Sequence, residues 1–246
     1  MAATEVGGAP PPEVDGLRAP EGLTPGSRIA RLRASHSYGL VLALVLVALV
    51  FTALAPDGDW STSLRVVILA TMLVVALWTS GVVRLTSWPI ATLLIVAAFG
   101  ALSPVVTGGR TFTGLLAIAD SALVAATIAV IGLGAVDQRE VNRQSLRAAI
   151  AVYLLFGLLF VSIYGGVAAL DSGPFFEQGI DGTTPQHWYF SFSTLATLGY
   201  GDFTAAGSLG HLLAVVEALI GQLYLVTVLA VLVGHLGQKR GGPDPR

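Results

Sequence analysis

The chain has 246 residues, of which 54% are hydrophobic and only 11% are charged, whereas an ordinary soluble domain carries about 25% charged residues. This composition excludes a water-soluble globular protein and describes a polytopic membrane protein. A net charge of -2 argues against a nucleic-acid partner, and the absence of cysteine excludes disulfides and thiolate zinc sites.

The first segment, residues 1–37, is rich in Pro and Gly and poor in large apolar residues. Such a segment buries too little apolar surface to offset its ordering entropy, so we expect a disordered cytoplasmic tail. It also lacks the apolar core that follows a basic start in a cleavable signal peptide.

Six apolar runs follow, each close to the roughly 20 residues that a helix needs to cross a bilayer. They occupy residues 39–55, 64–83, 89–106, 113–136, 148–170 and 209–236. The third run is crowded by Pro89, Gly100 and Pro104, which a membrane helix tolerates as a kink when its neighbours satisfy the freed carbonyls. We therefore predict an all-α membrane protein with six transmembrane helices.

The distribution of Lys and Arg predicts the orientation, because these residues accumulate on the cytoplasmic side. If the N-terminus is inside, only Arg65 and Arg110 of the 13 Lys and Arg residues lie outside. We therefore expect both termini to be cytoplasmic, in a multi-pass protein of the plasma (cell inner) membrane.

The longest gap between runs, residues 171–208, falls on the outer side between the last two spans. Within it, residues 187–196 form an aromatic, hydroxyl-rich stretch of helical length after Pro185, where a helix can begin. The Gly-broken segment TLGYGD, residues 197–202, comes next. A short helix and an irregular strand between two spans predict a re-entrant loop. Because non-helical backbone survives at membrane depth only where it lines a polar cavity, this order indicates a pore.

The TLGYGD segment resembles the TxGYGD selectivity-filter signature of potassium channels, and the order of span, pore helix, filter and span is similar too. In that family, backbone carbonyls from four copies of the loop replace the water shell of a potassium ion. The resemblance implies potassium binding by the first four residues of the segment, Thr197, Leu198, Gly199 and Tyr200. Gly201 completes the implied filter and Asp202 forms its outer mouth. Glycines suit the filter because alternate residues adopt backbone conformations closed to residues with a Cβ.

One such loop supplies one wall of a pore, so the resemblance also implies a tetrameric channel architecture, a homotetramer in the lipid bilayer. We expect potassium ions as the permeant ligand and no cofactor. Ser193 stands where some relatives carry a carboxylate that pairs with the filter Asp. A hydroxyl cannot make that charged pair, so Asp202 is expected to find its partner in Trp188 or Tyr189.

The last run resembles the inner helix of prokaryotic potassium channels. Gly221 stands where that family carries a hinge glycine, and a small residue for close helix packing is an equally good interpretation. Helical spacing from Gly221 predicts that one face of this run lines the inner cavity. The residues on this face are Ala218, Gln222, Leu225 and Leu229.

Two carboxylates lie inside predicted spans, where such groups are costly and usually functional or paired. Glu217 is expected to be neutral or hydrogen-bonded behind the pore helix, the alternative being that it adds field to the cavity. Asp120, in the fourth run, is expected to pair with Arg65 or Arg110 in a static bridge. That run contains no Lys or Arg, so we expect no steep voltage dependence, because voltage sensing needs charges that move through the field.

These observations predict a sensor-like domain of four helices without gating arginines (38–136), a cytoplasmic linker (137–147), a pore domain (148–236) and a short cytoplasmic tail (237–246). The predicted function is a potassium-selective channel without strong voltage gating. We expect no enzyme, since no catalytic constellation is present. Two alternatives stay open: a secondary transporter, which would need internal repeats with broken helices, and a non-conducting membrane protein with a decayed filter.

Overall fold

The structure, a computed structural model, describes residues 37–80, 109–136 and 143–240. These residues form helices joined by loops, and apart from isolated bridges at Phe176 they contain no strand. The helices are α2 (Ser37–Leu54), α3 (Asp59–Ser80), α5 (Arg110–Val136), α6 (Arg143–Leu170), α7 (Thr184–Leu195) and α8 (Gly207–Arg240).

Four of these helices are long and apolar enough to cross a membrane: Trp60–Ser80, Arg110–Gly134, Arg143–Leu170 and Gly207–Val228. They correspond to the second, fourth, fifth and sixth predicted runs. The first run forms a shorter apolar helix, Tyr38–Leu54. The third run, residues 89–106, and the predicted tail up to residue 36 lie outside the described residues, so the count of six spans stays a prediction.

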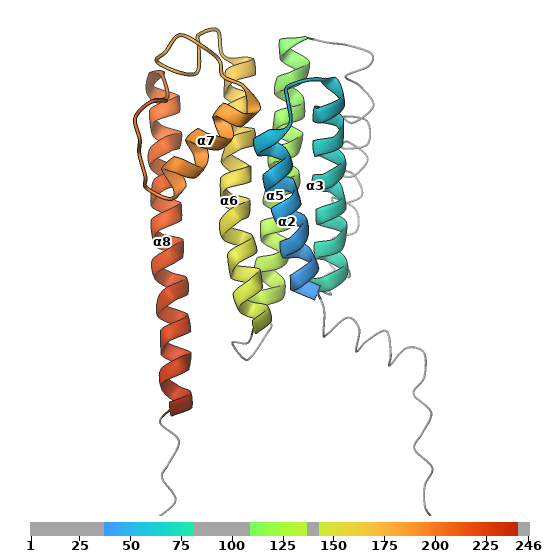
Figure 1. The fold of residues 1–246 in the computed structure, drawn as a ribbon, viewed down its shortest axis with the longest axis vertical. Coiled ribbons are helices and arrows are strands. Elements are labelled where there is room, and N and C mark those ends of the chain that lie inside the picture. The colour runs from blue at the N-terminus through green and yellow to red at the C-terminus, as the bar shows by residue number, and fades with distance from the viewer. Residues whose placement is uncertain (1–36, 81–108, 137–142, 241–246) are drawn as a thin grey trace, which may run out of the picture.

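The helices α2, α3, α5 and α6 stand side by side as one bundle (Figure 1). The short helix α7 lies obliquely beside α6, and α8 stands at the edge of the molecule, where it contacts α7 and α6. The TLGYGD segment, which joins α7 to α8, therefore lies at the end of the molecule's row of helices rather than inside the bundle.

The bundle is held by an apolar core to which all four of its helices contribute. Its fully buried side chains include Val41, Val45, Met72, Leu73, Leu123, Ile131 and Leu155. A second cluster, rich in aromatic rings, lies between α6, α7 and the loops on either side of α7 and includes Phe160, Tyr164, Phe175, Phe176 and Phe190. The second cluster is the one that supports the TLGYGD segment.

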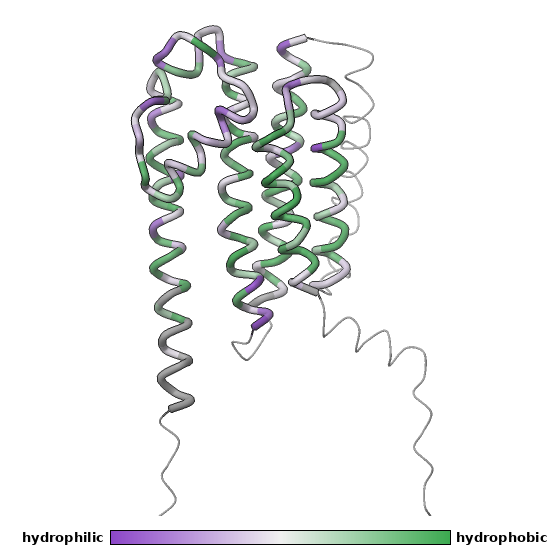
Figure 2. The backbone as a smooth tube through the Cα atoms, in the orientation of Figure 1, coloured by the Kyte–Doolittle hydropathy of each residue, from purple (hydrophilic) through white to green (hydrophobic). Residues whose placement is uncertain are grey.

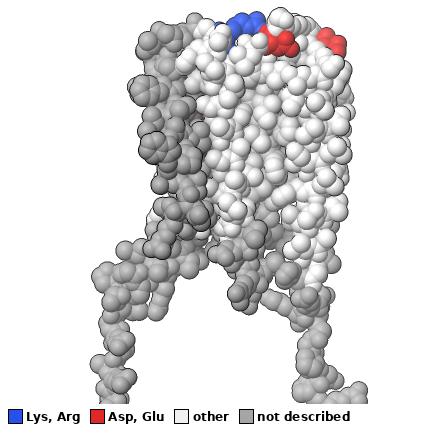
Figure 3. Space-filling model, turned by 180° about the vertical axis from the view of Figure 1, so that it is seen from behind, with Lys and Arg blue, Asp and Glu red and all other residues white. Residues whose placement is uncertain are grey.

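The outward faces of the bundle are apolar as well, as expected for surfaces that meet lipid. Exposed apolar side chains include Leu46, Val50, Val67, Val74, Leu115, Ile118 and Leu133. Figure 2 shows apolar residues along the length of the helices and polar residues toward their ends. On the face in Figure 3, charged side chains gather at one end of the molecule, while the flank that is not drawn in grey is uncharged.

Three boundaries of the predicted domains differ from the structure. Ser37, the last residue of the predicted tail, is the first residue of α2. The helix α6 begins at Arg143, so residues 143–147 of the predicted linker are helical. These residues, RQSLR, are mostly good helix formers and extend the span by one turn. At the other end, α8 continues to Arg240, past the predicted start of the tail at 237.

Candidate functional site

The helix α7 begins at Thr184, a little earlier than predicted, because its N-terminus is capped from two sources. Thr183 and Gln186 form a capping box, in which the Thr183 N–H donates to Gln186 Oε1 at 2.7 Å and the Gln186 N–H donates to the Thr183 hydroxyl. Pro185 occupies the first turn, where its missing N–H costs nothing. In addition, the carboxylate of Asp57, from the loop between α2 and α3, accepts from the Thr184 N–H at 3.2 Å.

The TLGYGD segment starts from the last turn of α7 and is also held by α8. The N–H groups of Leu198 and Gly199 both point to the Ser193 carbonyl oxygen, at 2.8 and 3.3 Å. The hydroxyl of Thr197 accepts from Gln222 Nε2 of α8 at 3.1 Å. Two helices thus fix the position at which this segment begins.

Alternate residues of the TLGYGD segment adopt positive φ. The values are 56° at Thr197, 56° at Gly199 and 80° at Gly201. This region favours glycine, and a β-branched residue such as Thr197 is a genuine outlier there. In an ordinary strand successive peptide groups face opposite sides. A backbone that alternates the sign of φ can instead turn successive carbonyls to one side, which is the arrangement that a carbonyl-lined filter needs.

Within the single chain, the TLGYGD segment lies open on the surface. Leu198 is 59% exposed and Tyr200 is 66% exposed. A Cβ added at Gly199 or Gly201 would meet no atom of the chain within 4 Å. The backbone of this segment is therefore available to a ligand or to another chain.

Asp202, at the far end of the segment, is held by two side chains. Tyr189 donates its hydroxyl to Asp202 Oδ1 at 3.2 Å, and Gln178 Nε2 donates to the Asp202 carbonyl at 2.7 Å. The Tyr189 ring also stacks on Tyr200, with centroids 5.9 Å apart. Of the two expected partners of Asp202, the structure selects Tyr189, whereas the buried indole N–H of Trp188 has no hydrogen-bond partner within the described residues.

The sequence analysis did not predict the aromatic support that Phe176 and the rings around it form between the loops before and after α7. The buried ring of Phe176 lies between 5.1 and 5.5 Å from the rings of Phe203, Phe190 and His187. The backbone around it joins the loop before α7 to the loop after the TLGYGD segment, since the Ala206 N–H donates to the Phe175 carbonyl at 2.7 Å. The available signal was the Phe175–Phe176 pair in an otherwise polar loop.

His187, in the first turn of α7, is buried beside this support. Its Nε2 lies 2.9 Å from the Asp181 carbonyl oxygen, and because a carbonyl only accepts, Nε2 carries the proton. Burial lowers the pKa of His187 to about 4, against the smaller opposing effects of this hydrogen bond and of the Asp57 and Asp181 charges. The ring is therefore neutral at physiological pH.

The four residues of α8 predicted to line a cavity differ in their surroundings. Gln222 is exposed and contacts Thr197, as described above. Leu225 is exposed and Ala218 is half-buried. The side chain of Leu229 lies outside the described part of the structure. A cavity between copies of α8 stays a prediction.

Gly221 is buried where α8 crosses the end of α7. A Cβ added there would lie 2.5 Å from the Leu195 carbonyl oxygen, a distance that a real side chain does not tolerate. Glycine therefore permits the close approach of two helices, which is the packing interpretation of this residue. Its role as a hinge stays a prediction.

Glu217 is fully buried between α6, α7 and α8. Tyr164 of α6 donates its hydroxyl to Glu217 Oε2, and the Ser191 hydroxyl of α7 lies against Oε1, both at 2.5 Å. This is the hydrogen-bonded position that the sequence favoured over a carboxylate directed into a cavity.

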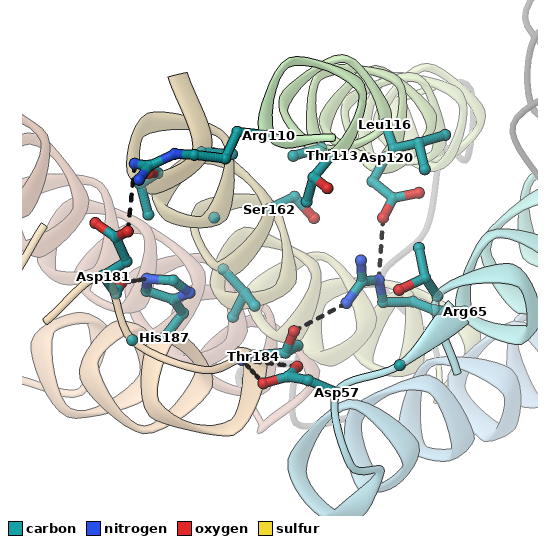
Figure 4. A pocket seen from close by; sticks show the side chains of 18 residues that line it. Asp57, Arg65, Arg110, Thr113, Leu116, Asp120, Ser162, Asp181, Thr184 and His187 are labelled. Carbon is teal, nitrogen blue, oxygen red and sulfur yellow. Dashed lines mark hydrogen bonds and ion pairs between the residues drawn. The ribbon is translucent and has the colours of Figure 1, made fainter. Parts of the chain in front are cut away.

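A polar cavity of about 430 Å³ lies between α3, α5, α6 and the start of α7 (Figure 4). On its wall, Arg65 Nε donates to Asp120 Oδ2 at 3.0 Å, and Arg65 Nη1 donates to the Thr184 hydroxyl at 3.3 Å. Arg110 instead pairs with Asp181 at 3.3 Å. Of the two expected partners of Asp120, the structure therefore selects Arg65, and this pair, of which the carboxylate is buried, joins α3 and α5 to α7.

Comparison with known proteins places residues 148–237 in a family described as "Ion channel". This range covers most of α6 and α8, all of α7 and the TLGYGD segment. The chain is also 30% identical over 91 residues to an inward rectifier potassium channel, Kirbac3.1, of Paramagnetospirillum magnetotacticum. That match covers 37% of this chain and 29% of the relative, so the chain spans less than a third of the relative's length.

No solved structure matches the chain significantly. The capped helix, the TLGYGD segment and most of the two flanking apolar helices nevertheless lie within the range that the ion-channel family covers. Residues 148–237 therefore match an ion-channel family, and a part of the chain of about this length is similar to a potassium channel.

Proposed function

We propose that four copies of this chain surround a potassium-selective pore that is lined by the backbone carbonyls of the TLGYGD segment. The alternation of positive φ at Thr197, Gly199 and Gly201 carries this proposal, because it follows directly on a capped helix and lies open to the outside of the chain. Carbonyl oxygens arranged in this way replace the hydration shell of a dehydrated cation.

Potassium would bind at Thr197, Leu198, Gly199 and Tyr200, with Asp202 at the outer mouth. The contacts of this segment with α7 and α8 support a fixed spacing of its carbonyls, since Ser193 holds its second and third residues and Gln222 holds its first. The ion would leave toward the face of α8 that carries Ala218, Gln222, Leu225 and Leu229.

An unpartnered apolar stripe on α8 supports assembly into a closed ring. Its side chains are each more than half exposed and recur at helical spacing: Leu209, Leu212, Leu219, Leu223 and Val226. One loop supplies one wall of a pore, so cyclic symmetry of four copies would both complete the ring of carbonyls and cover part of this stripe.

We further propose that this channel lies in the plasma membrane with both termini cytoplasmic and opens without strong voltage dependence. After Arg110 at its first position, α5 contains no basic residue. Its carboxylate, Asp120, is buried and tied to Arg65. A charge that is paired and immobile does not move through the membrane field, so the membrane potential does little work on it.

Ion flux into liposomes tests the proposal. Purified protein should carry potassium but not sodium, and Gly201→Ala should abolish this flux because alanine is strained at a φ of +80°. Gly173→Ala is the matched control: it also adds a Cβ in open space but lies at ordinary φ, so flux should persist. Equal sodium and potassium flux, or flux in a particle shown by mass to be monomeric, would contradict the proposal.

A further inference from the structure

The buried cluster around Glu217 brings together one side chain from each helix of the predicted pore domain. Tyr164 comes from α6, Ser191 from α7 and Glu217 from α8, and each of them is fully buried. The Ser191 hydroxyl has two neighbours, since its Oγ lies 2.5 Å from Glu217 Oε1 and 2.9 Å from the Gly157 carbonyl oxygen of α6. The three helices of this domain thus meet at a buried cluster of polar side chains.

The number of protons in this cluster can be counted. Its three contacts each need one hydrogen: Tyr164 to Glu217, Ser191 to Glu217, and Ser191 to Gly157. With an ionised carboxylate only two hydroxyl hydrogens are present, and Ser191 has one hydrogen for two acceptors. With a protonated carboxyl, Glu217 donates from Oε1 to Ser191, and Ser191 donates onward to Gly157. Every contact is then satisfied.

The charges around Glu217 agree with the protonated form. Its hydrogen-bond partners are the hydroxyls of Tyr164 and Ser191, and Tyr153 of α6 is a further titratable group near it. In the part of the chain that the structure describes, no Lys or Arg forms an ion pair with Glu217. A buried carboxylate without a cation is costly, so a neutral carboxyl is the stable form.

The cluster lies in register with the TLGYGD segment. Glu217 and Gly221 are four residues apart on α8, and their neighbours Ser191 and Leu195 are four residues apart on α7. Two successive turns of α8 therefore meet two successive turns of α7. The second of these turns carries Ser193, whose carbonyl holds the start of the TLGYGD segment. A shift of α7 against α8 would therefore move that segment.

We propose that Glu217 is a protonated carboxyl that acts as a positioning residue for the filter, by fixing α7 against α6 and α8. This proposal rests on the proposed channel function for its effect on conduction. The protonation of Glu217 and its role in the register of α7 are inferred from its contacts with Tyr164 and Ser191 alone.

Infrared difference spectroscopy of the purified protein tests the protonation without any ion flux. At neutral pH, the difference between the natural protein and Glu217→Gln should contain the carbonyl stretch of a protonated carboxylic acid. Loss of a carboxylate band in its place would overturn the proposal.

Conservative and disruptive variants test the positioning role. In Glu217→Gln the amide donates to Ser191 and accepts from Tyr164. Conduction should therefore stay within about twofold of that of the natural protein, and the thermal midpoint should stay near its natural value. Glu217→Leu and Ser191→Ala should each lower the fraction of time that the filter conducts by about tenfold, since each leaves buried polar groups unsatisfied. Ser162→Ala is the control, because Ser162 bonds within its own helix.

The double variant Glu217→Leu with Ser191→Ala separates a shared cluster from two independent sites. Losses that do not add support the cluster, and losses that add contradict it. If the natural protein carries no ions, the proposed channel function fails, while the infrared band and the thermal midpoints of Glu217→Gln and Glu217→Leu still decide the proposal for Glu217. Equal midpoints for these two variants would overturn it.

Discussion

The carboxylate of Asp57 accepts a hydrogen bond from the backbone N–H of Thr184, 127 residues further along the chain. Both of its oxygens lie within 3.3 Å of that nitrogen. Arg65 reaches the side chain of the same threonine, so α3 and the loop before it are joined to the first turn of α7 at two points. The helix α3 and the loop that joins it to α2 thus share a contact with the helix that leads into the TLGYGD segment.

Asp57→Asn should weaken this contact by removing a negative charge from a helix N-terminus. The expected loss of stability is about 0.5–1 kcal/mol, because the charge interacts favourably with the helix dipole and with the Thr184 N–H, which has no acceptor inside its own helix. Thermal unfolding in detergent measures it. Asp171→Asn is the control, since the Asp171 side chain is exposed and, within the described residues, accepts a hydrogen bond only from the N–H of Ser172. Equal midpoints for the two variants would contradict the capping role.

Arg65→Leu should destabilise the protein more strongly, by about 3 kcal/mol, because it leaves Asp120 buried without a counter-charge. The double variant Arg65→Leu with Asp120→Leu should recover most of this loss, since it removes the buried charge as well. Unfolding midpoints of the two variants make the comparison. A double variant less stable than Arg65→Leu alone would show that the unpaired charge of Asp120 is not the reason for the loss of stability.

The sequence predicted those parts of the site that depend on local pattern. A Pro-initiated aromatic stretch predicted α7, and an intramembrane carboxylate predicted a hydrogen-bonded Glu217. Contacts across long separations were only partly predictable: Asp120 had two candidate cations, and nothing local distinguished Arg65 from Arg110. The role of Asp57 at Thr184 was invisible for the same reason, because charge near a helix start signals a cap only when the two are neighbours in sequence.

Other misses had a local signal that was not used. Thr183 and Gln186 stand three residues apart, as a capping box requires, and would have moved the start of α7 to its observed position. By contrast, the burial of His187 depends on Phe175 and Phe176, whose packing follows from the fold of a whole loop. Propensity carries no information on such packing.

Gly221→Ala should lower stability by about 1–3 kcal/mol, because the added methyl group overlaps the Leu195 carbonyl and forces α8 away from α7. Gly132→Ala, which meets open space within a helix, is the control and should leave stability unchanged or slightly raised. Unfolding midpoints report both. If Gly221→Ala changes channel opening while its midpoint equals that of the control, the residue acts as a hinge rather than as a packing position.

Acid should destabilise the folded chain through His187. Its pKa is about 4 in the folded state and ordinarily 6.5, so the unfolded chain binds the proton more tightly. Above pH 6.5 His187 is neutral in both states and the free energy of unfolding has its full value. As the pH falls from 6.5 to about 4, protonation of the unfolded chain lowers the free energy of unfolding by at most roughly 3 kcal/mol. Unfolding measured across this range should show a steeper slope for the natural protein than for His187→Gln. Parallel curves would contradict the burial of a neutral ring.

The reversal potential of a planar bilayer, with potassium on one side and sodium on the other, tests the central claim most directly. If the carbonyls of the TLGYGD segment form the filter, the current should reverse close to the potassium equilibrium potential, and channel opening should change little with voltage. A reversal potential near zero would show a pore that does not select potassium and would contradict the assignment of Thr197, Leu198, Gly199 and Tyr200 as its binding sites.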